Sequence, residues 1–163
     1  MSRQVLELET ILQEMLVEHQ NLLKQVEAHA AAMKVFDLKG MDAAQNQQEA
    51  LRLRLTALEN RRRSVVDVLA RAHPTQEKLL VSDIARLYPQ RGPALMKLRN
   101  DLKAVSAQLG ARLFVAGKVA GAVLGHLNTV VRLVAGIVEG AGLYTKQGVP
   151  KVAARIGAMN AVG

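Results

Sequence analysis

The 163-residue chain is half apolar, contains no cysteine and carries a formal charge of +8. The absence of cysteine excludes disulfides, thiolate nucleophiles and cysteine-ligated zinc, and it fits a reducing compartment such as the cytoplasm. Because aromatic residues make up only 2% of the chain, the core must consist of aliphatic side chains and alanine, which is typical of helix bundles.

The charge is distributed unevenly along the chain. Residues 1–42 contain seven acids and four bases, whereas residues 111–163 contain one acid and six bases. A basic surface is compatible with a nucleic acid, an anionic membrane or an acidic protein, and net charge alone does not choose among them. Arg3, Glu7 and Glu9 lie where the apolar part of a secretory signal would stand, so no such signal is predicted.

Residues 2–38 are predicted to form one long helix. Their apolar residues recur at alternating steps of three and four, which is typical of a coiled-coil seam. The members of this seam are Val5, Leu8, Leu12, Met15, Leu22 and Val26. Gly40 suits the left-handed C-cap of this helix and Asp42 the N-cap of the next. So short a connection predicts antiparallel neighbours.

The rest of the chain is predicted to contain a second, a short and a third long helix. The second continues the seam from Asp42 to about Ala72 through Leu51, Leu55, Leu58, Val65 and Leu69. We therefore expect an all-α, three-helix, coiled-coil-like bundle that forms a single domain. Its parts are the hairpin 1–73, an elbow with a short helix at 74–93, the third long helix at 94–144, and a flexible basic tail at 145–163.

Glycines interrupt the third helix after Gly110, and each is expected to weaken it by about 0.5–1 kcal/mol relative to alanine. Gly117, Gly121 and Gly125 stand at steps of four, a spacing that allows close helix packing. Three interpretations stay open: a close helix contact, an apolar face that binds a partner, or no special role. Membrane insertion is not expected, since the longest uncharged stretch, residues 119–131, is shorter than the roughly 20 residues that a span needs.

The sequence contains no phosphate-binding loop and no nucleophile elbow, and its four histidines lack a partner at metal-ligand spacing. We therefore expect neither an enzyme nor a metal or other cofactor. Residues 61–63 are three consecutive arginines. Consecutive helical residues point about 100° apart, and no aromatic platform accompanies them, so nucleic-acid binding is not expected. The alternative is that arginines of this helix pair with acids of the first helix such as Glu14, Glu18 and Glu27.

Six stretches, in this order, resemble the FlgN family of flagellar type III export chaperones. They are LETILQEML at 8–16, FDLKGMD at 36–42, LENRRR at 58–63, VSDIARLYP at 81–89, LRNDL at 98–102, and Tyr144 near Gly148 after a long apolar helix. The resemblance implies a helical hairpin with a third long helix and no enzymatic activity. It also implies a cytoplasmic protein that acts transiently at the inner-membrane export apparatus.

The resemblance further implies that the C-terminal helical region binds the terminal helices of hook-filament junction proteins, which are FlgK-like and FlgL-like. Tyr144 matches the family's tyrosine that contacts the export gate, an FlhA-like protein. Helical spacing selects the client-facing residues Leu113, Val119, Val123, Leu127, Val130, Val134 and Val138. This third helix departs from the family in its richness in glycine and alanine, and the tail after Tyr144 has no counterpart.

Two other classes of protein stay possible at this point. One is a coiled-coil scaffold or adaptor unrelated to export, in which the N-terminal hairpin would bind the partner. The other is a basic amphipathic protein of membrane surfaces. The heptad seam is also compatible with a homodimer, because the same pattern serves an intramolecular hairpin and an intermolecular one.

Overall fold

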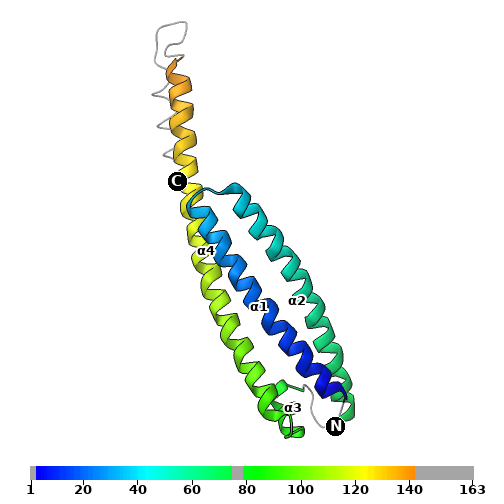
Figure 1. Cartoon of the computed structure of the whole chain (residues 1–163). Coiled ribbons are helices and arrows are strands. Elements are labelled where there is room, and N and C mark those ends of the chain that lie inside the picture. Colours follow the sequence, from blue (N-terminus) through cyan, green and yellow to red (C-terminus); the bar gives the residue numbers. More distant parts are fainter. Residues whose placement is uncertain (1–2, 75–78, 142–163) are drawn as a thin grey trace. The chain divides into compact units, whose positions relative to one another are not determined.

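The computed structural model describes residues 3–74 and 79–141, with side chains as far as residue 134 (Figure 1). These residues form four helices: α1 (Arg3–Lys34), α2 (Leu38–Ala72), α3 (Val81–Leu87) and α4 (Gly92–Ala141). The predicted all-α fold is confirmed. The chain divides into two compact units, residues 1–119 and residues 120–163. The first contains α1 to α3 and the beginning of α4, and the described part of the second is the continuation of α4.

Helices α1 and α2 run antiparallel and side by side (Figure 1). The predicted seam lies at their contact, where eight of its members are buried: Val5, Leu8, Leu12 and Val26 of α1, and Leu51, Leu58, Val65 and Leu69 of α2. Met15, Leu22 and Leu55 are half-buried. The three-and-four spacing therefore identified the packing face of both helices correctly.

The connection between α1 and α2 differs from the prediction, because α1 ends at Lys34 and not at residue 38. The Phe36 N–H donates to the Met33 carbonyl at 3.3 Å, and the Asp37 N–H donates to the Ala32 carbonyl at 3.0 Å. These two bonds form a Schellman motif, which satisfies carbonyls left open by the helix end. Phe36 takes the left-handed position, with φ of 56°, that glycine usually occupies.

Helix α2 begins at Leu38, so Gly40 does not end α1 and Asp42 does not cap α2, as we had predicted. The N-cap is Asp37, whose Oδ1 accepts a hydrogen bond from the Gly40 N–H at 3.0 Å. This bond satisfies one of the free N–H groups of the first turn, so the helix can begin at Leu38, before the predicted start at Asp42. A Cβ at position 40 would collide with the Asp37 carboxylate, so the glycine gives the cap its room.

Helix α3 closes one end of the first unit (Figure 1). The Asp83 carboxylate accepts a hydrogen bond from the Leu80 N–H at 3.0 Å and thereby helps to begin the helix. His73 Nε2, just after α2, and Tyr88 Oη, just after α3, are hydrogen-bonded at 3.0 Å, and their rings meet edge to face. All four helices contribute to the core here, with the fully buried residues Leu8, Ile11, Leu69, Ile84 and Leu95.

The candidate binding face of α4

Helix α4 has one face that packs against the core of the first unit. Leu95 and Val105 on this face are buried, and Leu98 and Leu102 pack against the same core while partly exposed. Their steps of three and four keep them on one side of a helix with 3.6 residues per turn. The beginning of α4 is therefore an ordinary core helix.

The same face continues past Val105 without becoming buried. None of the described side chains from residue 106 to residue 134 is buried. Steps of three and four nevertheless carry the apolar pattern onward through Leu109, Leu113, Ala116, Ala120, Val123, Leu127, Val130 and Val134. Over these residues, about seven turns, the face is half-buried or exposed and at no described position buried.

Most of the predicted client-facing residues lie on this exposed face. Leu113, Leu127, Val130 and Val134 are 40–54% exposed, and Val119 and Val123 are half-buried. We call these six residues, together with Leu109, the α4 stripe. Val138 lies within α4, but its side chain is outside the described part, and Tyr144 lies outside the described residues altogether.

Sequence reasoning missed a second group of exposed apolar side chains, which flank the stripe or lie on the other side of α4. They are Phe114, Val115, Leu124, Val131 and Leu133, each 47–66% exposed. Exposed apolar patches of this extent mark interaction surfaces in soluble proteins. Their signal in the sequence is the small number of polar residues between Leu113 and Val134, which are Lys118, His126, Asn128, Thr129 and Arg132; apolar side chains therefore lie on several sides of the helix.

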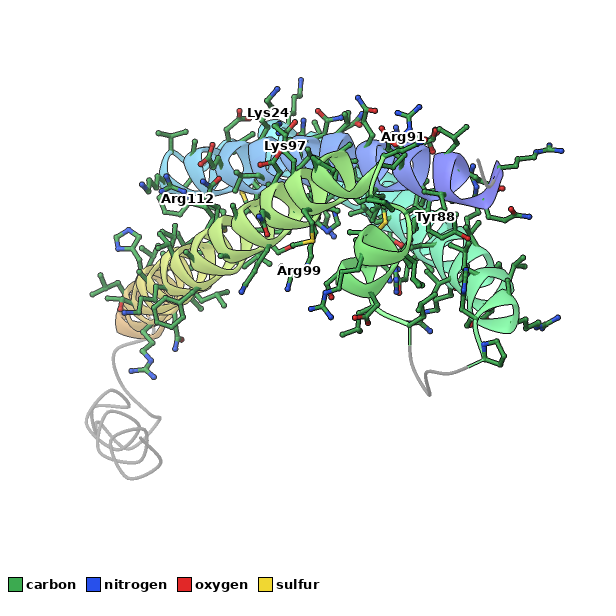
Figure 2. All side chains as sticks on the ribbon, turned by 90° about the horizontal axis from the view of Figure 1, so that it is seen from below. Lys24, Tyr88, Arg91, Lys97, Arg99 and Arg112 are labelled. Carbon is green, nitrogen blue, oxygen red and sulfur yellow. The ribbon has the colours of Figure 1, made fainter. Side chains whose placement is uncertain are left out.

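From residue 102 to residue 138 the sequence has no Asp or Glu, and four basic residues of α4 fall in this stretch, namely Lys103, Arg112, Lys118 and Arg132. Arg112 (Figure 2) pairs with Glu27 of α1 at 3.0 Å, and both side chains are about half exposed. Such a surface pair contributes about 0–1 kcal/mol, so it fixes α4 only weakly. The Lys118 ammonium lies 4.6 Å from the centre of the Phe114 ring, which leaves the apolar ring edge accessible.

The four glycines of α4 from Gly110 to Gly125 make no close contact within the described structure. A Cβ added at Gly110, Gly117, Gly121 or Gly125 would meet no atom within 4 Å. The close helix contact that their spacing had suggested is therefore not made within the described part of the chain. The glycines leave the helix weakly held by its own propensity, at a cost of about 0.5–1 kcal/mol each.

Five of the six arginines of α2 form ion pairs among the described residues. Arg61 pairs with Glu14 at 3.1 Å and Arg54 with Glu18 at 3.4 Å, which confirms the predicted pairing with acids of the first helix. Arg62 and Arg63 instead pair with Glu59 of their own helix. Glu27, also predicted to pair with α2, pairs with α4. These contacts leave no continuous cationic stripe on α2.

Among the residues that the structure describes, no group of three His, Cys, Asp or Glu side chains could hold a metal ion. His19 Nδ1 lies 2.7 Å from the Met15 carbonyl oxygen, and His29 Nδ1 lies 3.4 Å from Gln48 Nε2. Both contacts are ordinary for helix-surface histidines. They give the candidate face no metal chemistry.

One stretch of α4, Gly92–Val134, is long and apolar enough by length and composition to cross a membrane, with a mean hydropathy of 1.4 in its most apolar window. Core helices of soluble proteins meet the same criterion. Within this stretch, Lys118 and Arg132 bound the uncharged segment 119–131, and both side chains are exposed. A basic, apolar helix of this kind fits either a helical partner or a membrane surface.

The family model described as FlgN protein matches residues 1–151. The chain belongs to the FlgN family. This family consists of flagellar export chaperones, so the chain is a chaperone of flagellar proteins. The match covers α1 to α4, including the whole α4 stripe. No curated protein and no solved structure matched the chain.

Proposed function

We propose that this FlgN-family protein binds the C-terminal helical region of hook-filament junction proteins, FlgK-like and FlgL-like, on the α4 stripe. In doing so it prevents their premature assembly and delivers them to an FlhA-like export gate. The protein works in the cytoplasm and transiently at the inner-membrane export apparatus. The observation that carries this proposal is the packing face of α4, which buries Val105 and then continues, half-buried or exposed, as far as Val134.

The physical basis of capture is the exchange of solvent for a client helix. An amphipathic helix laid on the stripe would bury its own apolar face and that of α4, each large aliphatic side chain contributing roughly 1.5–3 kcal/mol. The client's assembly surface would be covered by the same contact. Because the glycine-containing part of α4 is weakly helical, some of this free energy is consumed in ordering it, which favours release at the gate.

The stripe can be tested with a matched pair of double variants. L127S/V134S removes one leucine and one valine from the stripe, and V115S/L133S removes the same two residue types from another side of α4. We expect the stripe variant to bind the C-terminal helical peptide of a junction protein at least tenfold more weakly, and the control to stay within about threefold of wild type. Fluorescence anisotropy with labelled peptide measures both. Equal losses would contradict the assignment of the stripe.

Tyr144 is proposed as the contact with the export gate. Its replacement by alanine should leave the affinity for the client peptide unchanged and weaken the complex between the loaded chaperone and the gate's cytoplasmic domain. Surface plasmon resonance with the immobilised gate domain measures this. Unchanged gate affinity would refute the role of Tyr144 without affecting that of the stripe.

A coiled-coil scaffold or adaptor unrelated to export is the alternative function. It would bind its partner through the α1–α2 hairpin, so L127S/V134S would leave that binding intact. Neither the wild-type protein nor the variant would then bind the junction peptide. A membrane-surface protein would instead float with anionic phospholipid vesicles and lose this property in L127S/V134S. Vesicle flotation and peptide binding on the same variants thus distinguish the three functions.

A further inference from the structure

A cleft of about 700 Å³ lies where α2, the start of α3 and α4 meet, away from the α4 stripe. From α2, Glu59, Arg62, Arg63 and Val66 line it, at spacings that place them on one side of the helix. Leu80, at the start of α3, and Arg99 of α4 complete its walls. The residues that line this cleft belong neither to the coiled-coil seam nor to the α4 stripe.

The cleft carries more guanidinium than carboxylate groups. The Glu59 carboxylate accepts hydrogen bonds from Arg62 at 2.7 and 2.8 Å and from Arg63 at 2.9 Å. Asp67 is the second acid of the lining. Arg99 donates to the neutral Asn100 Oδ1 at 3.2 Å and, within the described part of the chain, forms no ion pair. Three guanidinium groups therefore face two carboxylates.

The charge of Glu59 is constant over the physiological pH range. The Arg62 and Arg63 guanidinium groups lower the pKa of Glu59 to about 2, so this carboxylate stays ionised. Its two oxygens are already used by Arg62 and Arg63, which leaves Arg99 as the guanidinium best placed to accept a new anionic partner.

Part of the cleft lining is apolar. Leu80 is 54% exposed at its edge, and Val66 and Ala70 are half-buried on the α2 side. A small anion such as phosphate, or the sugar-phosphate backbone of a nucleic acid, would leave these side chains uncovered. No aromatic residue among those lining the cleft offers a stacking surface.

We propose that this cleft docks a segment of a partner protein that presents an Asp or Glu next to an apolar side chain, the acid pairing with Arg99 and the apolar group covering Leu80. A helix with the two residues three or four positions apart has this geometry. The proposal does not rest on the function of the α4 stripe. It gives the chaperone a second protein-binding site, which a client on the stripe leaves free.

Two variants of α4 provide a matched test. Arg99 lines the cleft, whereas Lys97, two residues earlier, projects from the opposite side of the helix (Figure 2). R99Q and K97Q each remove one positive charge from the same exposed turn, so they have the same effect on net charge. L80S tests the apolar side of the cleft without changing any charge.

The probe is a pair of alanine-based helical peptides that present Leu with Glu, or Leu with Gln, at i and i+4. They are added to the full-length protein while its arginine Nε–H signals are followed by NMR. We expect the Glu peptide to shift the Arg99 signal saturably and more weakly in high salt, and the Gln peptide to bind at least fivefold more weakly. R99Q and L80S should each weaken binding by about tenfold, and K97Q by less than twofold.

Four outcomes would overturn the proposal. They are no saturable shift of the Arg99 signal, equal affinity for both peptides, equal losses in R99Q and K97Q, or competition by inorganic phosphate at the peptide's own concentration. The last result would indicate a small-anion site. Retention of Glu-peptide binding in L127S/V134S supports the cleft, and its loss would show that the peptide binds the stripe instead.

Discussion

Gly92 and the carbonyl oxygen of Ala85 lie in direct contact: a Cβ added to Gly92 would stand 2.6 Å from that oxygen. Gly92 is buried, and its N–H donates to the Tyr88 carbonyl at 3.0 Å as α4 begins. The contact brings the first turn of α4 against the end of α3, and it places Leu95 in the core. The two helices can approach this closely because Gly92 has no side chain.

Gly92→Ala should destabilise the protein. The carbonyl of Ala85 belongs to a helical backbone that cannot move freely, so the added methyl group forces α3 and α4 apart at a cost of about 1–3 kcal/mol. Urea unfolding followed by circular dichroism measures the change in the midpoint. An unchanged midpoint would show that the junction of α3 and α4 adjusts without loss.

Gly117→Ala, Gly121→Ala and Gly125→Ala should have the opposite effect, because a Cβ at these positions meets no atom. Each change should stabilise the helical state of this part of α4 by about 0.5–1 kcal/mol. Hydrogen exchange of the α4 amides measures the gain even where the global unfolding midpoint stays constant. Faster exchange in the triple variant would contradict the weak-helix interpretation.

The three-and-four spacing made the hairpin predictable, because helical periodicity itself selects the faces that Leu8 and Leu58 bury. The hairpin turn was misplaced by several residues for a local reason. Gly40 and Asp42 have the residue types of a C-cap and an N-cap, but the chain turns at Phe36 and caps α2 with Asp37. A phenylalanine in the left-handed conformation has no signature in sequence patterns, since its φ is decided by the helices on both sides.

The apolar spacing of the candidate binding face can be seen in the sequence, but the exposure of its side chains cannot. Val105 and Leu127 occupy equivalent positions in the same apolar repeat, yet Val105 is buried and Leu127 is 43% exposed. The burial of Val105 depends on its contacts with other helices of the first unit, which is a property of tertiary packing that the spacing does not encode. The cleft beside Arg99 was not predicted at all, because its walls come from residues as far apart as Glu59, Leu80 and Arg99.

Phe36→Gly should stabilise the hairpin. Glycine takes a positive φ without the steric cost of about 1–2 kcal/mol that a side chain brings, although the contacts of the Phe36 ring are lost in the exchange. We expect a net gain of about 1 kcal/mol in urea unfolding. Asp37→Ala should lose about 1 kcal/mol in the same measurement, since it removes the N-cap bond to Gly40. A destabilised Phe36→Gly variant would show that the ring contacts outweigh the backbone strain.

Glu59 gives the protein one source of acid sensitivity. Hydrogen bonds from Arg62, with a further bond from Arg63, lower its pKa from 4.5 to about 2, against the opposing effect of burial. A group whose pKa is lower in the folded state stabilises the fold fully above its unfolded-state pKa. This contribution is then lost as the pH falls from about 4.5 towards 2. Because Glu59 is only partly buried, solvent screening limits it to about 1 kcal/mol.

Glu59→Gln should therefore lower the free energy of unfolding at pH 7 and have a smaller effect at pH 2.5, where the wild-type carboxylate approaches protonation. Urea unfolding at the two pH values measures the difference between wild type and variant. Glu7→Gln is the matched control, since Glu7 is exposed on α1 and forms no ion pair among the described residues; it should leave the free energy of unfolding within about 0.5 kcal/mol of wild type at pH 7. If the Glu59→Gln deficit were equally large at both pH values, its cause would be lost packing at α2 and not the lost charge, and the ion pairs with Arg62 and Arg63 would contribute nothing measurable.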